Sequence, residues 1–146
     1  MRVLVTGLSG VGKSALLAEL ASRGFVTVDT DYGPYHHVVA GERLWREDVV
    51  AELLASTPSL FVSGAVRNQM RFGFSHVVLL SCPASVLAHR LATRTSNSYG
   101  KGPGELEEAL EYLETVEPLL RASATLEVVT TIPVARVADV VLEHVL

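Results

Sequence analysis

The residues with the clearest chemistry lie near the start of the sequence, in the stretch VTGLSGVGKS at residues 5–14. Gly7, Gly12, Lys13 and Ser14 satisfy the spacing G-x-x-x-x-G-K-[ST] of a phosphate-binding loop, or P-loop. Its glycines allow a tight turn whose main-chain N–H groups face inward around phosphate oxygens. The lysine ammonium reaches the β- and γ-phosphates of a nucleotide, and the serine hydroxyl is a ligand for Mg²⁺. The stretch therefore predicts a site for ATP and Mg²⁺.

The surroundings of the P-loop favour the same interpretation. A strand is expected near residues 2–6 and a helix near residues 13–22, so the loop joins a strand to a helix whose positive dipole end faces the phosphates. A glycine-rich turn with a chance GKS sequence is the alternative, but it would not require these flanks. No N-K-x-D sequence, which reads guanine, is present. The predicted nucleotide-binding residues of this region are Gly7, Ser9, Gly10, Val11, Gly12, Lys13, Ser14 and Ala15.

The acidic partner of the metal is expected on an unusual strand. An ATPase of this class usually ends its third strand in an acidic residue, but here SLFVSG ends in Ser63 and Gly64. The sequence VTVDTD instead places Asp29 and Asp31 at the carboxyl end of the second strand, on the same side if the strand continues through them. Such residues also serve as turn formers. We expect Asp29 and Ser14 to hold Mg²⁺, and Asp31 to anchor the acceptor or accept its proton.

The elements that must position these residues follow the rhythm of an α/β fold. Short runs rich in Val and Leu alternate with segments of helical period, which predicts βαβ units around a parallel sheet. The sequence predicts strands near 2–6, 25–29, 59–63, 75–81 and 125–129. It predicts helices near 13–22, 43–56, 84–94, 105–121 and 134–145. Two stretches without a clear period, 30–41 and 95–104, are expected to be loops at the edge of the sheet where ligands bind.

Length and composition limit the class of protein. The 146 residues, 49% of them hydrophobic, suffice for a single domain over 1–146 with an aliphatic core. A net charge of −4 without a basic stripe argues against a nucleic-acid partner. Cys82 is the only cysteine, so no disulfide is expected, and no run of 18 apolar residues predicts a membrane span. We therefore expect a cytoplasmic protein, monomeric or weakly dimeric, with a small-molecule substrate.

From its P-loop to its last helix, the chain resembles shikimate kinases and nucleoside-monophosphate kinases. The resemblance rests on the form G-x-x-G-x-G-K-S, the D-x-D after the second strand, the glycine after the third strand and an arginine-bearing helix that leads into a loop. The blocks VDTD, LWRED and FVSG also resemble actinobacterial chains grouped as AAA-family ATPases or kinases. The resemblance implies a P-loop NTPase three-layer sandwich with a five-stranded parallel sheet. It also implies an ATP- and Mg²⁺-dependent phosphotransferase with a substrate-binding segment at about 31–58 and a lid loop at about 94–105.

The same resemblance implies roles for residues near the nucleotide. Arg90 and Arg94 lie four residues apart, on one face of the helix near 84–94, in the places of phosphate-clamping arginines. Arg94 is expected to stabilise the transition state together with Lys13, whereas for Arg90 a structural pair between helix and sheet is an equal alternative. The stretch TTIPVARVADVV resembles the loop and helix that pack against adenine, which would place Thr131 and Pro133 around the base.

The acceptor side is implied by further matches. Gly64 corresponds to the glycine-rich stretch that holds substrate, although shikimate kinases usually have several consecutive glycines there. Arg67 is a candidate for pairing with an anionic group of the acceptor. Arg43 and Arg46 are both candidates for the substrate arginine, and of these Arg46 is preferred; Trp45 either forms a stacking wall or packs a helix. Nucleoside-monophosphate, nucleoside and shikimate-like acceptors all stay open. A nucleotide-binding ATPase or switch protein without a small-molecule acceptor is the alternative function.

Overall fold

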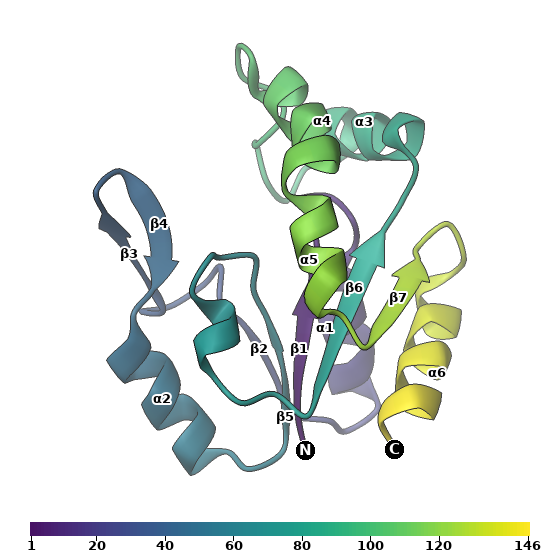
Figure 1. The fold of residues 1–146 in the computed structure, drawn as a ribbon. Coiled ribbons are helices and arrows are strands. Elements are labelled where there is room, and N and C mark those ends of the chain that lie inside the picture. Colours follow the sequence, from purple (N-terminus) through teal and green to yellow (C-terminus); the bar gives the residue numbers. More distant parts are fainter.

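Five parallel strands form the central sheet of the computed structural model, which describes residues 1–146 (Figure 1). The strands are β1 (Arg2–Thr6), β2 (Thr27–Asp29), β5 (Leu60–Ser63), β6 (His76–Ser81) and β7 (Leu126–Val129). They lie in the order β2-β5-β1-β6-β7, which confirms the expected α/β class with five parallel strands. Because β5 lies between β2 and β1, the acidic residues that follow β2 are one strand away from the strand that leads into the P-loop.

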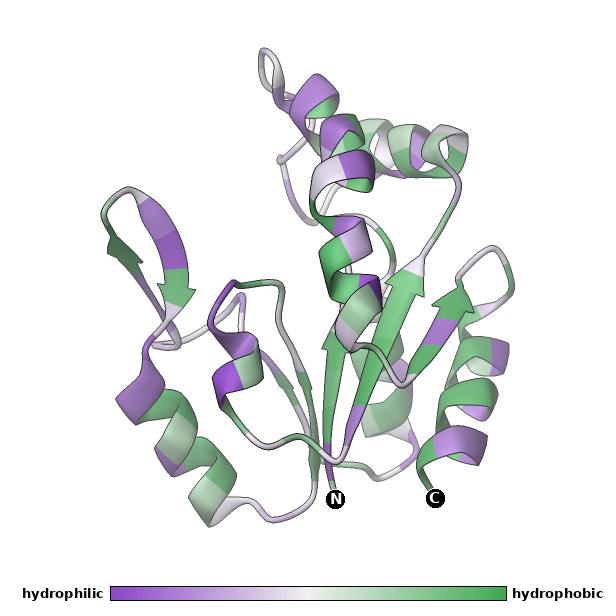
Figure 2. Cartoon of the chain, viewed as in Figure 1, coloured by the Kyte–Doolittle hydropathy of each residue, from purple (hydrophilic) through white to green (hydrophobic).

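Helices cover both faces of this sheet. They are α1 (Lys13–Ser22), α2 (Glu47–Ser56), α3 (Ala84–Thr93), α4 (Glu105–Thr115), α5 (Glu117–Ser123) and α6 (Val134–Val145). Successive strand residues face opposite layers, so Val3 and Val5 of β1 are buried with residues of α1 and α6. Leu4, between them, is buried with α2 in a second cluster. The sheet therefore lies between two helical layers, and Figure 2 shows its strands hydrophobic along most of their length.

The segment before α2 differs from the prediction. Residues 30–41 were expected to be a loop and 43–56 a helix, but β3 (His36–Val39) and β4 (Glu42–Trp45) form an antiparallel hairpin, and the helix begins only at Glu47. The two-residue turn of Ala40 and Gly41 has φ angles of 51° and 79°, as a tight hairpin requires. The hairpin stands apart from the central sheet in Figure 1. The prediction was wrong because each strand of the hairpin has only four residues, and the glycines and the proline around them are typical of a loop.

The predicted helix at 105–121 is also divided. α4 ends at Thr115 and α5 begins at Glu117, with Val116 between them. Pro118 lies in the first turn of α5, where its missing N–H costs nothing, whereas inside a continuous helix it would remove a hydrogen bond and clash with the preceding turn. The break therefore follows from the proline, which the prediction of one continuous helix did not take into account.

No helix in the structure combines the length and apolar character that crossing a bilayer requires.

Candidate active site

A cleft of about 1600 Å³ opens at the carboxyl ends of the strands. Its walls come from the P-loop at 8–16, the segment 63–67 after β5, the loop at 96–99 and parts of the hairpin. Residues of α4 and α5 and the start of α6 complete the lining. This is the sheet edge where ligands bind in open α/β folds, and it is the edge on which the sequence placed the site.

The P-loop has the backbone of an anion-binding turn. Gly7, Gly10 and Gly12 have φ angles of 148°, 92° and 112°. A Cβ atom on Gly7 would lie 2.5 Å from the main-chain oxygen of Leu80, so no larger residue fits there. Among residues 9–15, only the main-chain N–H of Val11 donates a hydrogen bond within the chain, to the main-chain oxygen of Leu8 (3.3 Å), which leaves those of Ser9, Gly10, Gly12, Lys13, Ser14 and Ala15 free. Donors left free in this way fit the phosphate oxygens of a nucleotide.

The Lys13 side chain folds back over the same loop. Its Nζ donates hydrogen bonds to the main-chain oxygens of Gly7 (2.5 Å) and Leu8 (3.0 Å). Burial of the ammonium lowers the pKa of Lys13 from 10.5 to about 8, although the carboxylates of Asp31 and Asp29 act in the opposite direction. A polyphosphate beside this lysine would favour its charged form, so the residue is suited to respond to an anion.

A carboxylate and two hydroxyl groups meet beside the loop. Asp29 accepts hydrogen bonds from Ser14 Oγ (2.7 Å) and Ser63 Oγ (3.2 Å), since its strand pairs with β5. Carboxylate and hydroxyl oxygens are the ligands that Mg²⁺ prefers, so Asp29 and Ser14 fit the role predicted for them. β2 ends at Asp29, and the N–H of Asp31 donates to Asp29 Oδ1 in a turn (3.1 Å). A turn therefore holds the two acids. The prediction had placed them on one side on the condition that the strand continued through both, and the strand ends at Asp29.

Trp45 connects the hairpin to the sheet and does not form a wall of the cleft. Its side chain is fully buried, and its Nε1 donates to Thr30 Oγ1 (3.2 Å), which itself donates to the main-chain oxygen of Ser63 (2.7 Å). A Cβ atom on Gly64 would lie 2.3 Å from the indole ring. Gly64 therefore provides the space that lets Trp45 fix the hairpin against the cleft.

The side of the cleft nearest the hairpin, where the acceptor was predicted, is lined by charged residues of this hairpin and of the segment after β5. Arg43 Nη1 lies 3.8 Å from Asp31 Oδ1, and Arg43 Nη2 donates to His36 Nδ1 (3.1 Å). Burial and the neighbouring Arg43 lower the pKa of His36. Arg46, the predicted acceptor residue, does not line the cleft and precedes α2 with its N–H bonded to the main-chain oxygen of Tyr35. The alternation of the hairpin brings Arg43 to the cleft, which only recognition of β4 would have shown.

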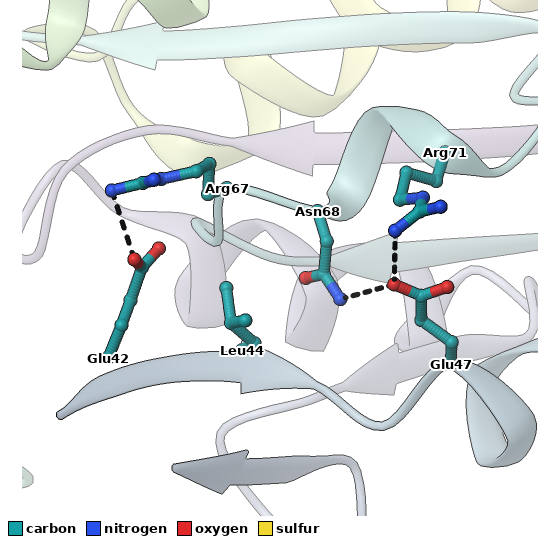
Figure 3. A pocket seen from close by; sticks show the side chains of 6 residues that line it. All are labelled: Glu42, Leu44, Glu47, Arg67, Asn68 and Arg71. Atoms are coloured by element: carbon teal, nitrogen blue, oxygen red, sulfur yellow. Dashed lines mark hydrogen bonds and ion pairs between the residues drawn. The ribbon is translucent and has the colours of Figure 1, made fainter. Parts of the chain in front are cut away.

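A smaller pocket of about 290 Å³ lies beside the cleft, between β4, the start of α2 and residues 67–71 (Figure 3). Arg67 pairs with Glu42 across it at 3.0 Å, and Arg71 pairs with Glu47 at 3.2 Å. Asn68 lies between the two pairs and also donates to Glu47 (3.2 Å). Glu42 and Arg67 line both spaces, whereas Glu47 and Arg71 line only the smaller pocket. The Arg67–Glu42 pair is therefore part of the wall of the cleft.

Arg94 joins the predicted lid loop to the P-loop. Its Nη2 donates to Ser9 Oγ (3.1 Å) and to the main-chain oxygen of Tyr99 (2.9 Å), and its Nε is buried without a hydrogen-bond partner. Burial lowers the pKa of Arg94. Lys101 donates to the main-chain oxygen of Arg94, and Tyr99 donates to Glu108 (2.6 Å), so the loop is held at both sides. A guanidinium that lines the cleft beside the P-loop is suited to contact a phosphate.

Arg90, the other predicted clamp, is engaged with the protein. It donates to the main-chain oxygens of Val11 (3.2 Å) and Thr130 (2.5 Å) and to the Thr130 hydroxyl (2.9 Å). Thr131 and Pro133, predicted around the base, are exposed and do not line the cleft. Apolar residues that line the cleft include Val116 before α5, Leu119 and Leu120 of α5, and Val134 and Val137 of α6. Their order in the sequence could not reveal them, because only the fold brings residues of both helices to one cleft.

Comparison of sequences identifies one family. Residues 3–112 match the AAA domain family. No curated protein sequence matches the chain. The matched range includes the P-loop, the hairpin, Arg90 and Arg94, so it contains most of the residues that line the cleft.

Solved structures share the fold at low sequence identity. A shikimate kinase from Acinetobacter baumannii, in complex with shikimate, is 17% identical with a TM-score of 0.69, covering 99% of this chain and 92% of that chain. A gluconokinase from Sinorhizobium meliloti 1021 is 24% identical with a TM-score of 0.63, covering 94% and 87%. A deoxyadenosine kinase from M. mycoides with bound dATP is 13% identical with a TM-score of 0.64, covering 99% and 98%. This similarity shows that the structures share a P-loop fold, and it does not identify the substrate of this chain.

Proposed function

The chain belongs to the AAA domain family, and from this premise we propose that it transfers the γ-phosphoryl group of ATP, with Mg²⁺, to a small-molecule acceptor. One observation carries the proposal: P-loop N–H groups without an acceptor in the chain and the Asp31 carboxylate line the same cleft, and Asp31 lies near enough to Lys13 to act on its pKa. Structures with this fold include kinases of shikimate and deoxyadenosine, whose acceptors are small molecules. The proposed layout is a single domain over 1–146, with an acceptor segment at about 31–58 and a lid at about 94–105.

The donor end has residues for each part of a magnesium nucleotide. The free N–H groups and Lys13 would bind the phosphate oxygens, and Ser14 with Asp29 would hold the metal. Bound Mg²⁺ supplies positive charge to the phosphates and orients them. Apolar residues of α5 and α6 that line the cleft, among them Leu120 and Val137, would offer a surface for the base.

The proposed transfer needs a hydroxyl oxygen near Asp31. This oxygen forms a bond to the γ-phosphorus while the bond from that phosphorus to the β–γ bridging oxygen breaks and ADP leaves. The proton of the hydroxyl passes to the Asp31 carboxylate and then to water. Lys13 and Arg94 would stabilise the negative charge on the transferred group, because both lie beside the P-loop with buried charges.

The proposal is tested by following the phosphoryl group. The protein is incubated with ATP labelled at the γ-phosphate, Mg²⁺ and a panel of hydroxyl- and phosphate-bearing metabolites. Label in one acceptor, with turnover that this acceptor accelerates, supports a kinase. Label only in inorganic phosphate, unchanged by every acceptor, would contradict the proposal and favour an ATPase or switch protein.

A further inference from the structure

The positive charges on the two sides of the cleft have different kinds of hydrogen-bond and ion-pair partners. On the donor side, Lys13, Arg90 and Arg94 take part in none of the ion pairs of the chain. These three side chains donate instead to main-chain oxygens and hydroxyl groups. No carboxylate lies within ion-pair distance of them, although Asp31 and Asp29 are near enough to raise the pKa of Lys13. These cations therefore keep room for direct contact with an anion such as a nucleotide triphosphate.

On the acceptor side, every guanidinium that lines the cleft already has a carboxylate partner. Arg67 Nη2 lies 3.0 Å from Glu42 Oε2, and Arg43 Nη1 lies 3.8 Å from Asp31 Oδ1. The charges of the two arginines and two acids balance, and His36 Nδ1 accepts a hydrogen bond from Arg43, as a neutral imidazole can, which agrees with the lowered pKa of His36. The acceptor side therefore carries no net positive charge.

This balance selects against an acidic acceptor. A phosphate or carboxylate group that approached Arg43 or Arg67 would also meet Asp31 or Glu42, and the repulsion would offset the attraction. A hydroxyl group, in contrast, both donates and accepts hydrogen bonds. A paired carboxylate and guanidinium offer such a hydroxyl group a hydrogen-bond acceptor and a hydrogen-bond donor side by side.

We propose, on the basis of the proposed function, that the acceptor is a neutral molecule with several hydroxyl groups, of the sugar or nucleoside class. One hydroxyl oxygen bonds to the γ-phosphorus and gives its proton to Asp31, as described above. The others are held by the Arg67–Glu42 and Arg43–Asp31 pairs. Nucleoside monophosphates and carboxylic acids are excluded by charge and not by size.

The test compares pairs of acceptors in which one member carries an anionic group that the other lacks. Two matched pairs are offered with labelled ATP: a sugar with its sugar acid, and a nucleoside with its 5′-monophosphate. We expect the neutral member of one pair to have a kcat/KM at least about tenfold above that of its anionic partner. The pair that shows the effect distinguishes a sugar acceptor from a nucleoside acceptor.

Two variants give the charge argument a direct readout. Glu42→Gln leaves Arg67 unpaired in the cleft, so the neutral-over-anionic ratio of kcat/KM should fall about fivefold. Glu47→Gln is the matched control, because Glu47 pairs with Arg71 and lines only the smaller pocket in Figure 3. It should leave the ratio unchanged.

The outcomes separate this inference from the function on which it rests. A wild-type protein that phosphorylates the anionic members better, or a ratio that Glu42→Gln and Glu47→Gln change equally, overturns the neutral acceptor and leaves the kinase in place. Label in no acceptor of either charge overturns both proposals. Transfer to a neutral member, with a ratio that only Glu42→Gln lowers, supports them.

Discussion

The donor and acceptor sides of the cleft use the same residue types in different ways. Lys13 and Arg94 bond to main-chain oxygens, whereas Arg43 and Arg67 pair with carboxylates. Main-chain oxygens hold a cation in place without cancelling its charge, but a carboxylate cancels it. The comparison shows that the field at a site depends on what fixes each arginine or lysine, and not on how many of them are present.

The largest expected effect concerns the ammonium of the donor side. Lys13→Ala should lower kcat/KM by about 10³-fold, because one preorganised charge at the transferred group is lost. The free energy of unfolding should change by less than about 1 kcal/mol, since removing a partly buried charge offsets its two lost hydrogen bonds. Steady-state kinetics and thermal melts measure these quantities. An equal loss of acceptor affinity would show that the two sides are not independent.

Arg90 of α3 and Arg94, which follows that helix, should differ in whether they mainly serve the ligand or the fold. Arg94→Ala should lower kcat about 10²-fold and destabilise the protein less than Arg90→Ala, because Arg94 donates two hydrogen bonds within the chain and Arg90 donates three. Arg90→Ala should mainly destabilise the protein, by about 1–3 kcal/mol, since it leaves the oxygens of Val11 and Thr130 without this donor. Kinetics and denaturant unfolding of both variants decide between these roles. A reversed pattern would make Arg90 the phosphate contact.

The metal side of the donor region gives a smaller effect. Asp29→Asn preserves the size of the side chain and an oxygen that accepts from Ser14 or Ser63, but it removes the negative charge that favours Mg²⁺. The Mg²⁺ concentration at half-maximal rate should rise about tenfold, while the acceptor KM stays the same. Asp31→Asn is the matched comparison and should lower kcat without raising the Mg²⁺ requirement. An unchanged metal dependence in Asp29→Asn contradicts the assignment.

The smallest expected effect is a proton taken up with the nucleotide. The pKa of Lys13 is about 8 in the free protein, and a bound polyphosphate raises it, so binding at pH 8.5 should take up more than about half a proton. At pH 7 the uptake from this residue should be near zero, because Lys13 is already charged. Calorimetry in buffers of different ionisation enthalpy measures the number of protons. Lys13→Ala should remove the uptake at pH 8.5.

The lowered pKa of Lys13 also makes the free energy of unfolding depend on pH. Because the pKa of Lys13 is lowered from 10.5 to about 8, the unfolded chain binds more protons than the folded chain between these pH values. The contribution of Lys13 to the free energy of unfolding therefore rises with pH across this window. Below pH 8 the cost of the buried charge is fully present. Comparing the pH profiles of the wild type and Lys13→Ala isolates this contribution.

Much of the fold and the donor side could be predicted from local patterns. The P-loop, its strand and its helix are contiguous, so spacing alone places Gly12, Lys13 and Ser14 together. The approach of Asp29 to Ser14 follows because the carboxyl ends of parallel strands meet at one edge. The hairpin was missed because its residues were read as a loop and a helix. As a result, Arg46 was chosen from the candidates Arg43 and Arg46, whereas the structure brings Arg43 to the cleft.

The sequence by itself determined the phosphate site, because glycines, lysine and serine at fixed spacing allow one local backbone and one kind of ligand. Only the tertiary structure decided the partners of the arginines. Whether Arg90 bonds to Thr130, Arg94 to Ser9, or Arg67 to Glu42 depends on which segments the fold brings together. The charge that a side chain offers to a ligand is what its neighbours leave uncancelled, and those neighbours lie far away along the chain.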